Sequence, residues 1–164
     1  MKKVEDGFTL IELLIVVVIL GILAALVSGN FITSLKKGRD ARRKTDLEQV
    51  QRALEMYYED NKVYPKAGVA VGEIDLTTGG KLCYPSVSGC DTKIYMQRLP
   101  QDPSSNCQYY YVRETAPYGE GYRLYATIEN SQDQGPGVDQ GGYAGTNCGT
   151  NCKCKFLVGS ANYP

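Results

Sequence analysis

The feature that most constrains this chain is an apolar run near its N-terminus, residues 8 to 28, FTLIELLIVVVILGILAALVS. As a helix rising ~1.5 Å per residue it would span about 31 Å, which matches the ~30 Å hydrocarbon core of a bilayer. The run is longer than the ~7–15 apolar residues of an ordinary cleaved signal peptide, and no good A-x-A site follows it. We therefore expect residues 8–28 to form a transmembrane helix.

Glu12 is the only charged residue in this run and lies near its N-terminal end. A carboxylate at mid-bilayer costs roughly 2.5–3.5 kcal/mol, so an intramembrane charge suggests a functional site with a partner. Cleavage after Gly7 would give Phe8 an α-amine close to Glu12 in sequence. An amine and a carboxylate ~4 Å apart attract by roughly 4 kcal/mol at an effective dielectric of about 20, before desolvation. The alternative is that Glu12 only extends toward the lipid headgroups.

Basic residues and cysteines give conflicting indications of topology. Before the run, the only positive groups are the α-amine of Met1 and the side chains of Lys2 and Lys3. The segment after the run carries six basic residues: Lys36, Lys37, Arg39, Arg42, Arg43 and Lys44. The positive-inside rule alone would place the C-terminal part in the cytoplasm. An even number of cysteines in a small Tyr- and Gly-rich region favours an oxidising compartment instead: Cys83, Cys90, Cys107, Cys148, Cys152 and Cys154. No C-x-x-C pair supports a zinc site, so we expect three disulfides in an extracytoplasmic head.

Six cysteines allow 15 pairings in principle. Cys83 and Cys90 bracket the turn-forming residues 85–89 and are the expected local pair. A bond between Cys152 and Cys154 would be strained, because alternate residues of a strand have Cα atoms near the ~7 Å limit. We therefore expect Cys107 to reach Cys152 or Cys154 and Cys148 to take the other.

The start of the chain carries a family resemblance. The stretch Gly7-Phe8-Thr9-Leu10-Ile11-Glu12 follows the short polar leader MKKVED, and it resembles the class III signal of type IV pilins and type II secretion pseudopilins. The resemblance implies cleavage between Gly7 and Phe8 by a prepilin peptidase, and N-methylation of Phe8. It also implies that Glu12 registers each incoming subunit by meeting the Phe8 amine of a neighbour.

The helical pattern continues beyond the apolar run to about Asn61. An apolar stripe recurs at spacings of three and four, formed by Leu47, Val50, Leu54 and Tyr57 with Tyr58 beside them. We interpret the charged residues between them as a solvated face, which in a filament could also pair between subunits. Gly21 fits the family pattern, and Gly29 is a weak helix position because Gly costs about 1 kcal/mol relative to Ala. We therefore expect the helix to be flexible at Gly21 and Gly29.

The second half of the chain predicts a small antiparallel sheet. Residues 107–113 and 122–129 are typical of strands, and the linker TAPYGEG makes them a hairpin; residues 153–158 suggest a last strand. The expected fold is α+β: a long N-terminal helix with a small antiparallel β-sheet head. We divide the chain into a leader, 1–7, a long helix, 8–61, and a globular head, 62–164. Residues 40–65 resemble the second half of the long pilin helix, and residues 94–103 resemble the segment before the sheet of major pseudopilins.

The sequence offers little for catalysis. It contains no His, the commonest general base, and no complete nucleotide-binding or hydrolase motif. We expect no enzymatic activity and no required cofactor. Tyr109-Tyr110-Tyr111 could stack on DNA bases or sugars, but a strand with one buried and two half-exposed tyrosines is the simpler interpretation.

A polar loop offers oxygen ligands for calcium from Glu129, Asn130, Asp133 and Asp139. Major pseudopilins that resemble this chain bind calcium in the corresponding loop. The alternative is a loop that is only solvated.

The resemblance implies a structural subunit of a type IV pilus-like filament. It would be inserted in the inner membrane as a single-pass precursor and would end in an extracellular pilus or a periplasmic pseudopilus. Its partners would be copies of itself, the prepilin peptidase, an assembly platform protein with its ATPase, and inner membrane lipid before assembly, with DNA or surfaces as further candidates. The alternatives are a type II secretion major pseudopilin and a membrane-anchored extracytoplasmic binding protein or enzyme.

Overall fold

One long helix dominates the structure. The computed structural model describes residues 7–68, 74–84, 90, 93–114 and 121–160, without the side chains of 27–30. Helix α1 runs from Leu10 to Asn61. The chain forms two compact units, Met1–Lys36 and Lys37–Pro164. We describe these units separately.

The first unit consists of the N-terminal part of α1. Its described apolar side chains are exposed; Leu10, Leu14 and Leu26, for example, are 82%, 56% and 70% exposed. Among the described residues no single helix passes a length and hydropathy test for a membrane span, but Leu10–Leu26 and Phe31–Asn61 pass it together. The span at residues 8–28 therefore stays a prediction.

The C-terminal end of α1 has a local cause. The Asn61 side-chain amide donates to the Tyr57 carbonyl oxygen at 2.8 Å, which satisfies one of the last helical acceptors. Lys62 follows with φ 58°, and its N–H donates to the Tyr58 carbonyl oxygen at 2.7 Å. A left-handed residue after the last turn redirects the chain, and the helix ends where the sequence predicted.

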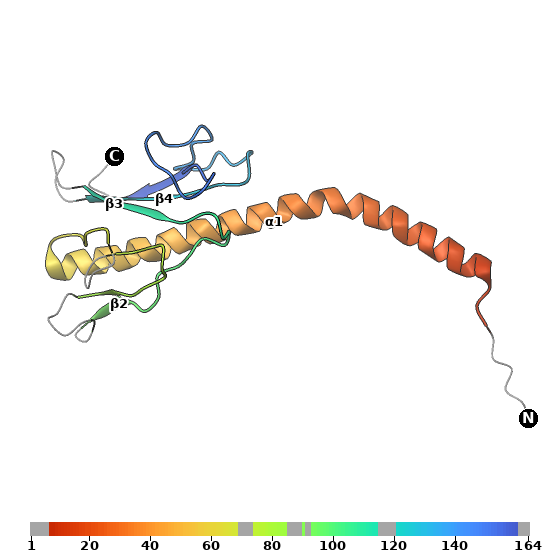
Figure 1. Cartoon of the computed structure of the whole chain (residues 1–164), viewed down its shortest axis with the longest axis horizontal. Helices are drawn as coiled ribbons and strands as arrows, with labels where there is room; N and C mark the ends of the chain where they lie inside the picture. The colour runs from red at the N-terminus through yellow and green to blue at the C-terminus, as the bar shows by residue number, and fades with distance from the viewer. Residues whose placement is uncertain (1–6, 69–73, 85–89, 91–92, 115–120, 161–164) are drawn as a thin grey trace, which may run out of the picture. The chain divides into compact units, whose positions relative to one another are not determined.

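Two antiparallel sheets flank α1 in the second unit. Strands β1 (Leu82–Cys83) and β2 (Ile94–Met96) form a two-stranded sheet, whereas β3 (Tyr110–Glu114), β4 (Gly121–Ala126) and β5 (Phe156–Gly159) form a three-stranded sheet in that order. In the view of Figure 1, β3 and β4 lie on one side of the C-terminal half of α1 and β2 lies on the other. The predicted α+β fold and the β3–β4 pairing are confirmed. The hairpin linker, residues 115–120, lies outside the described residues. The two-stranded sheet was not predicted.

The core forms where the apolar stripe of α1 meets the sheet. Leu47, Val50 and Leu54 are fully buried, and they share one hydrophobic cluster with Tyr122 and Leu124 of β4. The predicted stripe is therefore confirmed. Because the C-terminal half of α1 supplies much of this core, it belongs to the same compact unit as the head.

The burial of the three consecutive tyrosines, Tyr109 to Tyr111, differs from our prediction. Tyr109 and Tyr111 are buried, and only Tyr110 is exposed, at 40%. Alternate residues of a strand point to the same face, so both buried rings face the core. The Tyr109 hydroxyl donates to Asp46 at 2.8 Å, and the Tyr111 hydroxyl donates to the Pro65 carbonyl oxygen at 2.7 Å. The prediction of one buried and two half-exposed rings was wrong.

Disulfides hold the C-terminal loops together. The structure pairs Cys83 with Cys90, Cys107 with Cys152, and Cys148 with Cys154, with Cα–Cα distances of 5.4, 5.6 and 5.1 Å. Tyr125, on the outer face of β4, packs in a second cluster with Cys148, Cys152 and Cys154. The loop that carries these cysteines thus covers the face of the sheet that does not face α1.

Gly149 allows the closest approach in this loop. Its φ is +120°, and a Cβ there would lie 2.3 Å from the Asn106 carbonyl oxygen. A side chain at this position would force the loop away from the segment that carries Cys107.

We expect alkylation of the unreduced, denatured protein to label no cysteine, because all six are paired. The Cys107→Ser/Cys152→Ser variant should lose about 2–5 kcal/mol of unfolding free energy, because this bridge closes the longest loop. Mass spectrometry measures the first result and denaturant unfolding the second. A stoichiometric free thiol would contradict the pairing.

Candidate functional site

Thr9 and Glu12 form a reciprocal cap at the start of α1. The Thr9 N–H and hydroxyl both donate to Glu12 Oε2, at 2.9 and 2.7 Å, and the Glu12 N–H donates to Thr9 Oγ1 at 3.3 Å. This is a capping box, in which a T-x-x-E pattern satisfies N–H groups that have no helical acceptor. The sequence signal for this cap is the T-x-x-E pattern of Thr9 and Glu12, which our prediction did not include.

The cap changes how Glu12 can act. Its carboxylate already accepts hydrogen bonds from Thr9 of the same chain, without a neighbouring subunit. A carboxylate has about four acceptor positions, so capping leaves capacity for a further donor such as an α-amine. Glu12 can therefore both begin the helix and bind a cation.

The residues around the expected cleavage point are unpacked. A Cβ on Gly7 would meet nothing within 4 Å, and Phe8 is 87% exposed. A side chain at Gly7 would therefore disturb no packing among the described residues. Leader residues 1–6 lie outside the described residues.

Gly21 and Gly29, two of the three glycines in α1, both lie within its helical range. A Cβ on Gly21 would also meet open space. The backbone is helical through Gly29, although the side chains of 27–30 are outside the description. Flexibility at these glycines stays a prediction.

The N-terminal part of α1 is apolar on every side. Four consecutive residues, Leu13 to Val16, are 63%, 56%, 51% and 50% exposed, and together they cover a full helical turn. A helix that is hydrophobic all round is stable only when an apolar medium or other helices surround it. This surface is the strongest indication of function in the structure.

A buried arginine fastens the head to the helix. Arg43 is fully buried, and its guanidinium binds both carboxylate oxygens of Asp102, at 2.8 and 2.9 Å. The same group binds Asp40 at 2.7 Å and Glu129 at 2.8 Å. Burial alone would lower the pKa of Arg43, but the hydrogen bond with Asp102 leads the effects that raise it. Arg43 is therefore a fixed cation.

The carboxylates around Arg43 are themselves held in place. Asp40 accepts the backbone N–H groups of Glu129 and Asn130, at 3.0 and 2.8 Å. Arg39 donates to Glu129, and this hydrogen bond, together with the hydrogen bond and charge of Arg43, lowers the pKa of Glu129 to about 2 despite its partial burial. The network joins α1, the segment before β3 and the loop after β4.

The charges of α1 are thus not a uniformly solvated face, contrary to our interpretation. Arg43 and Asp40 are buried, and Glu55 accepts the hydroxyls of Tyr64 and Tyr122 at 3.0 and 2.9 Å. No sequence pattern separates buried Arg43 from its neighbour Arg42, whose side chain is 64% exposed.

The four candidate calcium ligands do not converge in the structure. Glu129 binds arginines, Asp133 binds Lys44 at 2.7 Å, and exposed Asp139 accepts the Gly141 N–H at 2.8 Å. Asn130 Oδ1 accepts the Gln132 N–H at 3.2 Å. Within the described part of the chain, no three His, Cys, Asp or Glu residues are grouped to hold a metal ion.

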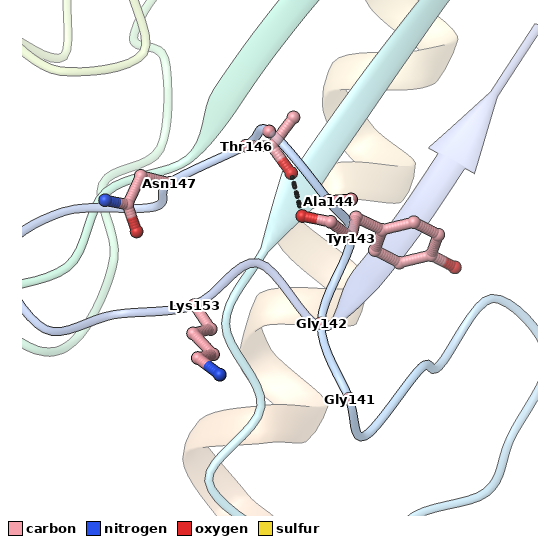
Figure 2. A pocket seen from close by; sticks show the side chains of 8 residues that line it. Gly141, Gly142, Tyr143, Ala144, Thr146, Asn147 and Lys153 are labelled. Atoms are coloured by element: carbon pink, nitrogen blue, oxygen red, sulfur yellow. Dashed lines mark hydrogen bonds between the residues drawn. The ribbon is translucent and has the colours of Figure 1, made fainter.

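A hollow of about 520 Å³ lies in the C-terminal loops, and Figure 2 shows the side chains around it. It is lined by residues 141–147 and by Lys153. Thr146 Oγ1 donates to the Tyr143 carbonyl oxygen at 2.9 Å, which stabilises the turn between them. The titratable side chains that line the hollow are those of Tyr143 and Lys153.

We compared the chain with known proteins. Residues 2–28 match the family model described as the prokaryotic N-terminal methylation motif. Residues 30–141 match the family model described as type II secretion system (T2SS), protein G. None of the solved structures matches the chain significantly.

Several curated relatives are named type II secretion system core protein G. The protein from Pseudomonas aeruginosa is 32% identical over 139 residues, which cover 84% of this chain and 93% of its own length. The protein from Vibrio cholerae is 39% identical over 108 residues, or 65% of this chain and 71% of its own. The protein from Aeromonas hydrophila is 35% identical over 105 residues, or 64% and 71%.

We expect Arg43→Met to destabilise the head by about 3–5 kcal/mol, because it leaves Asp40 and Asp102 buried without their cation. The matched control is Arg42→Met, which removes an exposed arginine from the adjacent position and should change stability by less than about 1 kcal/mol. Denaturant unfolding of both variants measures the difference. Equal effects would contradict the role assigned to Arg43.

Proposed function

Because the chain belongs to the type II secretion system protein G family, we propose that it is the major pseudopilin, the repeating subunit of a periplasmic pseudopilus. The sequence alone favours a type IV pilus-like filament and keeps the pseudopilin as the alternative. The protein G match over residues 30–141 and the relatives named core protein G support that alternative instead.

The observation that carries this proposal is the exposed apolar helix with a single carboxylate at its start. Leu13 to Val16 expose apolar surface on every side, as a helix does when its surroundings are first lipid and then other helices. Packing and polar contacts, rather than hydrophobicity, decide association of such helices, since lipid is as apolar as a neighbouring subunit. The transfer from membrane to filament is therefore nearly neutral for the apolar residues.

Cleavage after Gly7 would complete the assembly site. It would place a cationic, N-methylated amine on Phe8, next to the capped carboxylate of Glu12. In a filament the amine of one subunit would bind Glu12 of another, which neutralises both charges and fixes the register. The methylation-motif match over residues 2–28 supports this processing.

The proposed partners follow from this cycle. They are a prepilin peptidase, an assembly platform with its ATPase, inner membrane lipid before assembly, and other copies of the chain. The protein would have a mechanical role and no catalytic activity of its own. A membrane-anchored enzyme is less well supported, because a simple anchor needs neither Glu12 nor the Gly7-Phe8 junction.

Two substitutions separate the charge of Glu12 from its role in the cap. Glu12→Gln removes the charge but keeps the capping-box pattern, whereas Glu12→Ala removes both. We expect both variants to insert in the membrane and both to assemble poorly. The loss of even about 1.4 kcal/mol per contact lowers an association constant tenfold.

Membrane fractionation and the yield of sheared filaments measure these two steps. Glu48→Gln, which neutralises an exposed carboxylate in the second half of α1, is the matched control and should assemble normally. Normal filament yield from Glu12→Gln would contradict the charge pairing.

Deletion of the gene tests the choice between the two filaments. We expect loss of protein export to the culture medium, with surface pili and twitching unchanged, and restoration of export by the wild-type chain. Normal export together with lost surface pili would instead establish a type IV pilin.

A further inference from the structure

In the loop between β4 and β5, side-chain nitrogen atoms of the protein itself donate hydrogen bonds to the loop's oxygen atoms. The side-chain amide of Gln140 donates to two backbone carbonyl oxygens that converge on it, those of Asn130 at 3.1 Å and Asp133 at 2.7 Å. Convergent carbonyl oxygens are the kind of site that a calcium ion occupies in proteins. Here an uncharged N–H₂ group fills that position.

A lysine of the helix supplies the positive charge. Lys44 Nζ lies 2.7 Å from Asp133 Oδ2, and Asp133 Oδ1 accepts the Gly135 N–H at 3.0 Å. The hydrogen bond from Lys44 is the main cause that lowers the pKa of Asp133. Both side chains are mostly buried, with exposed fractions of 30% and 17%.

The position of Lys44 also leaves little room for a metal. Its ammonium lies 5.5 Å from the centroid of the Phe156 ring, and a Cβ on Gly135 would come within 3.3 Å of it. A divalent cation that bound Asp133 would be a close neighbour of this ammonium, and like charges at that distance repel strongly.

We infer that Lys44 and Gln140 take the place of a divalent cation in holding the loop of residues 129–141 on α1, so that the folded head needs no calcium. The resemblance to major pseudopilins implied calcium in this loop, and the donor set does not fit it. Every loop oxygen discussed above already accepts a hydrogen bond from the chain. The inference concerns folding and does not rest on the proposed function.

The test is thermal unfolding of the full-length chain in detergent, with excess EDTA and with added calcium chloride. We expect the same midpoint in both conditions for the wild-type protein. Lys44→Met keeps most of the aliphatic stem but removes the charge, and it should lower the midpoint by about 2–4 °C. Lys81→Met, at an exposed lysine outside the loop, is the control and should leave it unchanged.

A variant designed to bind calcium provides a second test. Lys44→Asp places a second carboxylate beside Asp133, so its midpoint should rise with calcium whereas that of the wild type does not. If this variant fails to fold, hydrogen exchange of the wild type still decides, because protection of the Gly135 and Asp139 amides should be the same with EDTA and with calcium.

Two results would overturn the inference. One is a wild-type midpoint, or loop protection, that falls in EDTA or rises with calcium. The other is a Lys44→Met variant as stable as the wild type in both conditions. Neither readout depends on secretion or filament formation, so failure here leaves the proposed function standing.

Discussion

The rest of this structure depends on one helix that must satisfy two environments. From Leu10 to Leu26 its apolar side chains are exposed, and they require lipid or other helices. From Leu47 to Tyr57 the same helix supplies part of the hydrophobic core of the head. The second half holds the head through the apolar stripe and the buried guanidinium of Arg43.

The head compensates for a modest core with polar connections. Its loops are rich in glycine, and an ordered loop of this kind loses much conformational entropy on folding. Three disulfides, the carboxylates around Arg43 and the contacts of Lys44 and Gln140 oppose that loss. They join segments that lie far apart in sequence, which suits a domain that works outside the cytoplasm.

Local patterns predicted the parts of the structure that depend on local physics. Spacings of three and four found Leu47, Val50 and Leu54, and alternation found the strand that contains Tyr122 and Leu124. The same patterns could not show that Arg43 is buried, because its partner Asp102 lies 59 residues away and adjacent Arg42 has the same chemistry. The burial of both Tyr109 and Tyr111 likewise depends on what covers each face of the sheet.

The central claim is that cleavage after Gly7 creates the amine that meets Glu12. Mass spectrometry of the N-terminal peptide, taken from the chain in purified filaments, tests it most directly. We expect a chain that begins at Phe8 with one methyl group on its amine. The Gly7→Val variant, whose new side chain meets no neighbour within 4 Å of its Cβ, should leave a folded precursor in the membrane. Filaments built from chains that begin at Met1, or after Gly29, would contradict it.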